Sequence, residues 1–281
     1  MIILLESVVE TLSFLMVVTA LITAPLVLYV TAPYGKFSVT GGTGWGPLLP
    51  AKFAWFLMES PNLWMFFCYK YIPYVDNSSI NNNFANLPYT NKILLSLFWL
   101  HYIHRTLIFP FNIYNSTPMP LSVCLLAFCY CCWNSFIQVG SLLTLEYNFE
   151  YSQSPNFLFG LSLFFIGMFI NIYSDTLLIN SRKNSREKYI IPRGFLFEYI
   201  SCPNYFGEII EWFGFSIACQ FSLPALAFAL FTLANIGPRA IRQHAWYKKK
   251  FENYPNRKAL IPFVVWVVEV LCFFVKIVYF C

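Results

Sequence analysis

The chain has 281 residues, of which 58% are hydrophobic, 20% aromatic and only 11% charged, with a formal net charge of +5. A soluble domain averages about 25% charged residues, so the composition excludes an ordinary soluble fold and indicates a polytopic membrane protein. The modest positive charge gathers in loops, which favours the cytoplasmic side of a membrane over nucleic-acid binding. The nine cysteines lie mostly within apolar runs and form no Cys/His framework, which predicts free thiols and no metal site.

Seven apolar runs predict an all-α bundle of seven membrane-spanning helices, at 8–31, 53–73, 92–111, 121–144, 157–180, 204–221 and 223–238. The first run carries Glu6 and Glu10 instead of a basic start, so we expect a retained span and not a cleaved signal peptide. The aromatic residues of 239–258 suit an interfacial helix. The last apolar stretch, 261–281, fits an eighth span, an interfacial helix or an irregular terminus.

The basic residues predict the orientation of the chain. With seven spans, the loop 182–188 and the segment 239–258 lie on the same side, and the positive-inside rule makes that side cytoplasmic. The N-terminus then faces the lumen or the exterior. Two glycosylation sequons test this topology, because Asn77 is expected on the non-cytoplasmic side and Asn115 on the cytoplasmic side.

Two ionisable residues lie in the early apolar runs. Glu59 is either the partner of a cation from another helix or a functional group, since an acid at membrane depth needs a reason. His101 and His104 are predicted to be hydrogen-bonded histidines at a helix end, in preference to metal ligands. Tyr102 between them is a neutral proton donor that can polarise a carbonyl, and Glu59 hydrogen-bonded to it would orient it.

A second polar group lies in the later runs. Asn171 and Asp175 share a helical face, and the next apolar run carries Asn204, Glu208 and Glu211. Arginines follow, and each can make paired, directional bonds to a phosphate. No glycine-rich phosphate loop is present, so any nucleotide site is built from helix side chains. From the residues alone, an enzyme and a transporter with an internal polar cavity both remain open.

The chain resembles the steroid 5α-reductase family over about residues 28–264. The blocks that carry the resemblance occur in the family's order: Thr31 to Gly35, Ala54 to Phe56, His101 with Tyr102 and His104 to Thr106, Gly167 with Met168, Asn171 with Ile172, Ser174 with Asp175, Ile191 to Gly194, Asn204 to Trp212, and Arg257 to Phe263. The combination is highly specific.

The resemblance implies an enzyme of the endoplasmic-reticulum membrane that uses NADPH to reduce the C4–C5 double bond of 3-oxo-Δ4 steroids. By position, Glu59 and Tyr102 match the pair that engages the steroid 3-carbonyl. Residues 1–264 match the transmembrane domain, whose part 120–264 binds the cofactor, and 265–281 form a hydrophobic tail. The positions that surround NADPH in the family correspond here to Asn171, Asp175, Arg182, Tyr189, Asn204, Glu208, Arg239, Tyr247 and Arg257.

Other functions stay open beside this one. A trans-2-enoyl-CoA reductase is related, although the block around Glu59 argues against it. An isoprenylcysteine methyltransferase would use S-adenosylmethionine and a prenyl substrate, and NADPH-dependent turnover would exclude it. A sterol-binding scaffold predicts no turnover, and the buried acids argue against it. The expected partners are a steroid and membrane lipid; the natural steroid and the oligomeric state are not specified by the sequence.

Overall fold

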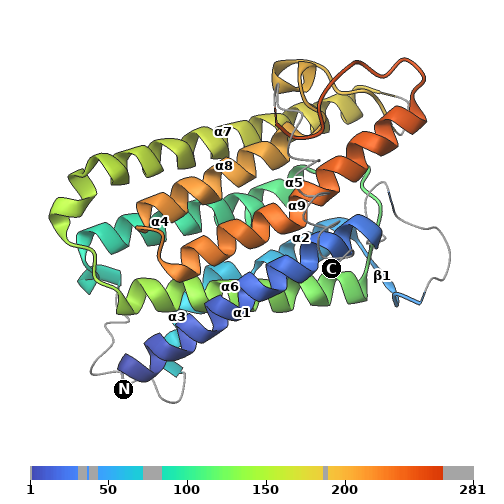
Figure 1. Ribbon diagram of the computed structural model, residues 1–281. Coiled ribbons are helices and arrows are strands. Elements are labelled where there is room, and N and C mark those ends of the chain that lie inside the picture. Colours follow the sequence, from blue (N-terminus) through green and yellow to red (C-terminus); the bar gives the residue numbers. More distant parts are fainter. Residues whose placement is uncertain (1, 31–36, 38–43, 72–83, 186–188, 262–281) are drawn as a thin grey trace, which may run out of the picture.

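The computed structural model describes residues 2–30, 37, 44–71, 84–185 and 189–261. The predictions for the Asn77 sequon and for the tail 265–281 fall on residues outside these ranges. The block 31–35 also lies outside them. Figure 1 shows a bundle of helices that run roughly along one common direction.

The described chain is mostly helical. Its helices are α1 Ile2–Tyr29, α2 Ala51–Glu59, α3 Pro61–Cys68, α4 Tyr89–Ile103, α5 Phe109–Asn112, α6 Leu121–Thr144, α7 Pro155–Lys183, α8 Pro203–Ala218 and α9 Leu223–Lys250. Short 3-10 turns occupy Tyr69–Tyr71, Phe84–Asn86, Phe149–Gln153 and Phe195–Glu198, and a π-helix, His104–Ile108, joins α4 to α5. Two short strands, β1 Leu48–Leu49 and β2 Met119–Pro120, pair antiparallel.

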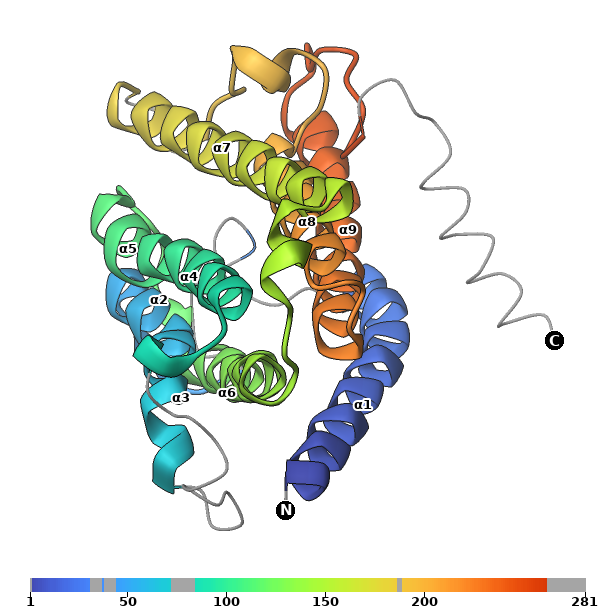
Figure 2. The ribbon, with the colours of Figure 1, turned by 90° about the vertical axis from the view of Figure 1, so that its left-hand side faces the viewer.

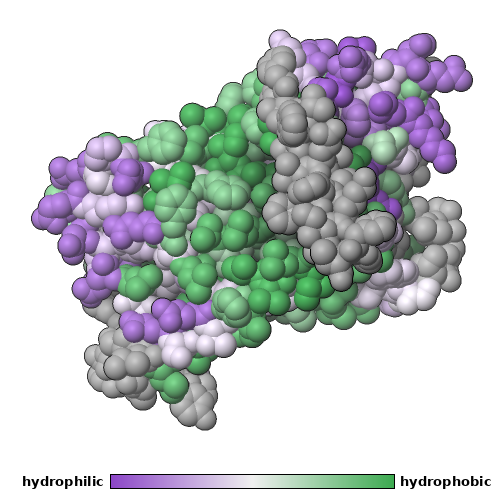
Figure 3. All heavy atoms as spheres, in the orientation of Figure 1, coloured by the Kyte–Doolittle hydropathy of each residue, from purple (hydrophilic) through white to green (hydrophobic). Residues whose placement is uncertain are grey.

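Five helical stretches of the described residues are long and apolar enough to cross a membrane: Leu4–Tyr29, Tyr89–Asn112, Leu121–Thr144, Pro155–Lys183 and Leu223–Lys250. Figure 3 shows hydrophobic surface across the middle of the bundle, with hydrophilic surface gathered toward both ends. The chain is therefore a polytopic membrane protein. The prediction of one continuous helix over 53–73 was wrong. The helix is broken at Ser60, because Pro61 begins α3 and cannot donate a backbone hydrogen bond.

Two further boundaries differ from the sequence prediction. The run predicted at 204–221 forms a helix of 16 residues, α8, which ends at Ala218 before a tight turn. The span predicted to stop at 238 instead continues through Pro238 to Lys250 as one helix, α9. Gly237 precedes this proline, and its missing side chain removes most of the clash that disfavours helical backbone before proline. The separate interfacial helix expected after residue 238 is thus the second half of α9.

Glycines bring α7 and α8 into close contact. Gly160 lies against the backbone of Gly214 and Ala218, and Gly167 lies against the backbone of Gly207 and Glu211. A Cβ atom added at Gly160 would lie 2.5 Å from the backbone nitrogen of Ala218, a distance at which the helices must separate. Small residues at the interface are what allows membrane helices to approach this closely. The pair holds the polar side chains of both helices in a fixed register.

The remaining helices lie on the α8 side of this pair, where α4 and α9 contact α8. Figures 1 and 2 show α1 along α9, while α2 and α3 lie along α6. The core is aromatic, and Trp212, Phe98, Phe164 and Phe215 are all essentially buried. In Figure 1 the N-terminal end of α1 lies at the same end of the bundle as the loop between α6 and α7, and the basic segments lie at the opposite end.

Candidate active site

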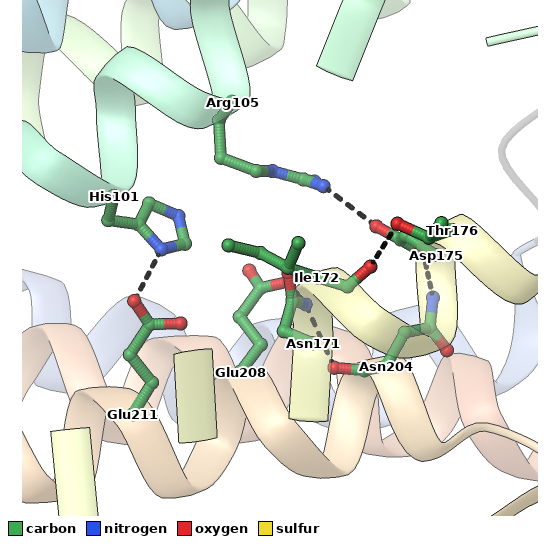
Figure 4. A network of polar contacts seen from close by, with 9 residues as sticks. All are labelled: His101, Arg105, Asn171, Ile172, Asp175, Thr176, Asn204, Glu208 and Glu211. Atoms are coloured by element: carbon green, nitrogen blue, oxygen red, sulfur yellow. Dashed lines mark hydrogen bonds and ion pairs between the residues drawn. The ribbon is translucent and has the colours of Figure 1, made fainter. Parts of the chain in front are cut away.

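A polar network joins α7 to α8 inside the bundle (Figure 4). The Asn171 side-chain amide donates to the backbone oxygen of Asn204 at 2.9 Å and to Glu208 Oε2 at 3.4 Å. Asn204 Nδ2 in turn donates to Asp175 Oδ1 at 3.0 Å. These four residues were all predicted from the sequence as site residues, and the structure brings them together. The glycine contacts described above place them, since Gly167 and Gly207 lie one helical turn from Asn171 and Asn204.

Arg105 extends this network to the other side of the bundle. Its guanidinium lies 3.5 Å from Asp175 Oδ2, and both side chains are about nine-tenths buried. The same group stacks over the rings of Trp55 on α2, at 4.9 Å, and Phe109 on α5, at 4.7 Å. A desolvated arginine gains both from the ion pair and from the aromatic faces. Arg105 therefore contacts helices on both sides of the site.

The π-helix determines where Arg105 points. Pro110 has no N–H group, and the N–H of Phe109 donates to the carbonyl of His104, five residues back, instead of four. The extra residue in this turn is typical of functional sites in helices. It carries Arg105 between Phe109 of the same helix and Trp55 of α2.

A buried histidine and glutamate lie one turn along α4 and α8 from these groups. His101 Nδ1 is 2.7 Å from Glu211 Oε1, and neither side chain is more than 5% exposed. The second oxygen of Glu211 has no hydrogen-bond partner among the described residues. The expectation that His101 is a hydrogen-bonded histidine is confirmed, but its partner lies 110 positions away and was not foreseen.

The two candidate catalytic residues both contact α6. The Cys131 thiol donates to Glu59 Oε2 at 3.6 Å, and Asn134 Nδ2 donates to the phenol oxygen of Tyr102 at 3.3 Å. Cys131 and Asn134 are three residues apart and therefore share one face of the helix. The direct hydrogen bond from Tyr102 to Glu59 that the sequence suggested is not formed in this structure; each side chain instead accepts a hydrogen bond from a residue of α6.

Tyr102 lies in an aromatic pocket. Its ring centroid is 4.7 Å from that of Phe98 and 5.9 Å from that of Trp212, and the residue is 4% exposed. Phe98 and Trp212 are themselves buried. A phenol in such surroundings stays protonated and can act as a neutral hydrogen-bond donor.

The basic end of the bundle holds the remaining predicted residues. Arg257 is 4% exposed; one of its terminal nitrogens donates to the Pro192 carbonyl at 2.9 Å, and the other lies 3.8 Å from Glu198. Its Nε and second terminal nitrogen have no hydrogen-bond partner in the described part of the chain. Glu198 is exposed, and the hydrogen bond that it accepts from the Gly194 backbone, followed by that from Arg193, lowers its pKa.

The other basic and aromatic candidates lie toward the same end of the bundle as Arg257. Tyr247 is buried and stacks on Tyr254 with ring centroids 5.3 Å apart, and the guanidinium of Arg257 lies 5.5 Å from the Tyr254 ring. Tyr189 packs edge-on against Trp246. Arg239 donates to Asn235 one turn before it on α9. Arg182, at the end of α7, is exposed. These residues thus gather at the end of the bundle where α8 begins.

Buried polar atoms without a hydrogen-bond partner favour a ligand between the polar network of α7 and α8 and the residues at the basic end of the bundle. Among the described residues they include Ser174 Oγ, Asn204 Oδ1, Glu211 Oε2 and the two Arg257 nitrogens. A buried donor or acceptor left without a partner costs about 1–3 kcal/mol, so each is expected to bind something that is not part of the chain. Guanidinium groups suit phosphates, and amides and carboxylates suit hydroxyl and carboxamide groups.

Sequence reasoning missed three polar residues of α6, namely Cys131, Asn134 and Gln138. All three are buried. The signal was present, because two amides at i and i+4 inside an apolar helix need partners as much as a charge does.

These features define an integral membrane protein with an internal polar and aromatic site. A model of the 3-oxo-5-alpha-steroid 4-dehydrogenase family matches residues 117–265. The chain is 43% identical to 3-oxo-5-alpha-steroid 4-dehydrogenase 1 of Rattus norvegicus over 240 residues, which cover 84% of this chain and 87% of the relative. It is 39% identical to the steroid 5-alpha-reductase DET2 of Arabidopsis thaliana over 254 residues, 86% of this chain and 91% of the relative.

The family is thereby shown. The chain belongs to the 3-oxo-5-alpha-steroid 4-dehydrogenase family of oxidoreductases. The family model covers α6 to α9 and the segment with Arg257, while Glu59, Tyr102 and Arg105 lie before its first matched residue.

Proposed function

We propose that this protein reduces the C4–C5 double bond of 3-oxo-Δ4 steroids to 5α-reduced 3-oxo steroids, with NADPH as the electron donor. Membership of the family supports the reaction class. The observation that carries the proposal for this chain is that Glu59 on α2 and Tyr102 on α4 both contact the same face of α6. Tyr102 also lies in the aromatic pocket of Phe98 and Trp212.

The residues act on the steroid carbonyl. Tyr102 donates its hydroxyl hydrogen to the 3-oxo oxygen, with Glu59 on the same side of the site. NADPH, when bound, supplies the hydride that adds to C5. As the C4–C5 double bond is lost, negative charge develops on the 3-oxo oxygen, and the hydrogen bond from Tyr102 stabilises it. A proton then adds to C4, which completes the addition of two hydrogens. The aromatic walls exclude water from this site.

The residues that would hold NADPH fall into two sets. Asn171, Asp175, Asn204 and Glu208 would bind the nicotinamide and ribose portion, next to Arg105. The phosphates would lie toward the basic end, near the remaining set of Arg182, Tyr189, Arg239, Tyr247 and Arg257. Two nitrogens of Arg257 and the side-chain oxygen of Asn204 have no hydrogen-bond partner in the described part of the chain, which supports this assignment.

Turnover tests the proposal directly. The full chain is expressed in microsomes and given NADPH with a panel of 3-oxo-Δ4 steroids, and products are analysed by mass spectrometry. We expect a 5α-reduced product two mass units heavier than the substrate. Membrane-inserted protein that binds NADPH but converts no steroid would contradict the proposal. Reduction of an enoyl-CoA in the same assay would favour the acyl-reductase alternative.

Replacing Arg257 should weaken NADPH binding selectively. Arg257→Ala removes a buried charged contact of about 1.5–3 kcal/mol, so we expect the KM for NADPH to rise about 10- to 150-fold, with a smaller change in kcat. Arg193→Ala is the matched control, because Arg193 lies on the neighbouring segment but its side chain is 61% exposed. An unchanged KM in Arg257→Ala would remove Arg257 from the cofactor site.

We further propose that residues 1–264 form one seven-span domain in the endoplasmic-reticulum membrane, with the N-terminus in the lumen. In this arrangement α2 with α3, and α8, complete the set of spans. The basic end, which would bind NADPH, then faces the cytoplasm.

Glycosylation tests this topology. Asn77 is expected to be glycosylated in cells, so that treatment with an endoglycosidase shifts the band on a gel and Asn77→Gln abolishes the shift. Asn115, which is exposed beyond α5 at the basic end, should stay unmodified, and Asn115→Gln should change nothing. A shift that depends on Asn115 would reverse the proposed orientation.

A further inference from the structure

A chain of buried amides runs along α6 behind Tyr102. Gln138 Nε2 donates to the backbone oxygen of Pro224 on α9 at 2.8 Å and to Asn134 Oδ1 at 3.3 Å. Asn134 Nδ2 donates to the phenol oxygen of Tyr102 at 3.3 Å. Asn134 is fully buried and Gln138 is 2% exposed. The chain starts at a backbone group and ends at a candidate catalytic residue.

The direction of every hydrogen bond in this chain follows from chemistry. The carbonyl of Pro224 can only accept, so the nitrogen of Gln138 and not its oxygen faces it. The second hydrogen of that nitrogen points at Asn134, which must present its oxygen there. The nitrogen of Asn134 is therefore left to face Tyr102. A flip of either amide would place two donors or two acceptors against each other.

This direction decides the role of the Tyr102 hydroxyl. Because its oxygen already accepts from Asn134, its hydrogen must point elsewhere. Within the described residues that hydrogen has no acceptor, although Tyr102 is 4% exposed. A buried hydroxyl without an acceptor costs free energy, which an incoming carbonyl oxygen would recover. The accepted bond from Asn134 also polarises the phenol and strengthens the bond that it donates.

We propose that Asn134 and Gln138 are positioning residues that hold the Tyr102 hydroxyl hydrogen toward the substrate carbonyl. This inference rests on the role of Tyr102 in the proposed function. Gln138 fixes the orientation of the Asn134 amide, and Asn134 fixes the orientation of the hydroxyl. The anchor on Pro224 makes the position of the phenol depend on the start of α9.

Kinetics of variants in α6 test the inference in the full-length membrane protein. Asn134→Leu removes the donor, and we expect kcat for steroid reduction to fall about tenfold while the KM for NADPH stays unchanged. Asn134→Asp keeps the shape of the side chain, and its carboxylate would draw the hydroxyl hydrogen toward itself, so kcat should fall at least as far. Gln138→Leu should lower kcat less, because Asn134 remains present.

Ser135→Ala is the matched control. Ser135 is equally buried on the same helix, but its hydroxyl donates to backbone carbonyls of the preceding turn, those of Cys131 at 2.6 Å and Cys132 at 3.2 Å. We expect its kcat to stay within twofold of the wild type. If Asn134→Leu does not accumulate in the membrane, Asn134→Asp carries the test because it preserves packing volume.

A double-mutant cycle separates this inference from the proposed function. In the slow residual turnover of Tyr102→Phe, measured over long incubations, adding Asn134→Leu should have no further effect, because the hydroxyl it positions is gone. A further tenfold fall would show that Asn134 acts elsewhere and overturn the inference. Wild-type kcat in both Asn134 variants beside an impaired Tyr102→Phe would also overturn it. Wild-type activity of Tyr102→Phe itself would instead overturn the assigned role of Tyr102.

Discussion

Replacing Tyr102 by phenylalanine should lower kcat for steroid reduction by about 10²–10⁴-fold, the usual contribution of a positioned proton donor. Phenylalanine keeps the aromatic contacts with Phe98 and Trp212 and removes only the hydroxyl. The protein should therefore insert normally and bind NADPH with unchanged affinity. Rates of product formation and a direct NADPH binding measurement check the two halves of this expectation.

Glu59→Gln is expected to give a loss of the same order, since it keeps the shape of the side chain and removes the carboxylate that accepts from Cys131.

Tyr151→Phe is the matched control for Tyr102→Phe. The Tyr151 hydroxyl donates to the backbone carbonyl of Ile217 at 3.2 Å. This contact lies at the end of the bundle opposite the basic residues. Wild-type rates in either site variant would remove that residue from the mechanism, while a slow Tyr151→Phe would point to a general loss of stability.

The second large effect is expected at the contact of α7 with α8. Gly167→Leu should abolish folded protein, because even a Cβ atom at this position would overlap the backbone of Gly207 and Glu211. A backbone cannot rotate away as a side chain can, so the cost is expected to exceed the ~1–3 kcal/mol of ordinary overpacking. The measurement is the amount of protein that survives detergent extraction and size-exclusion chromatography.

Ser162→Leu provides the control for added bulk on the same helix. Ser162 is exposed on α7 and donates only to the carbonyl of Leu158 one turn before it. A leucine there faces lipid, and we expect wild-type amounts of protein. Full recovery of folded Gly167→Leu with normal NADPH affinity would contradict the close packing of the two helices.

Much of the site was predictable because polar groups are costly in a membrane. Asp175, Glu208 and Glu211 stand out in their apolar runs for this reason, and all three take part in interactions inside the bundle. Their partners were less accessible. His101 and Glu211 are 110 positions apart, and no local pattern in the sequence connects two residues so distant.

The helix boundaries show a similar division between local and global causes. Long apolar runs identified α1, α6 and α7 closely, since length and hydropathy are enough there. The break at Ser60 and the continuation of α9 through Pro238 depend on how each proline is accommodated. A proline after a serine began a new helix in one case, and a proline after a glycine was absorbed in the other, so the residue type alone does not decide.

The π-helix at His104–Ile108 has a consequence for changes in chain length. A π-turn is an α-helix with one residue inserted, so a deletion of one residue within it would restore regular hydrogen bonding. The backbone after that deletion would keep its place, because the wider turn already absorbs the extra residue. A deletion within α4 has no such turn to absorb it, so it would rotate everything after it by about 100° around the helix axis and carry Arg105 away from Asp175. In this segment the number of residues matters as much as their identity.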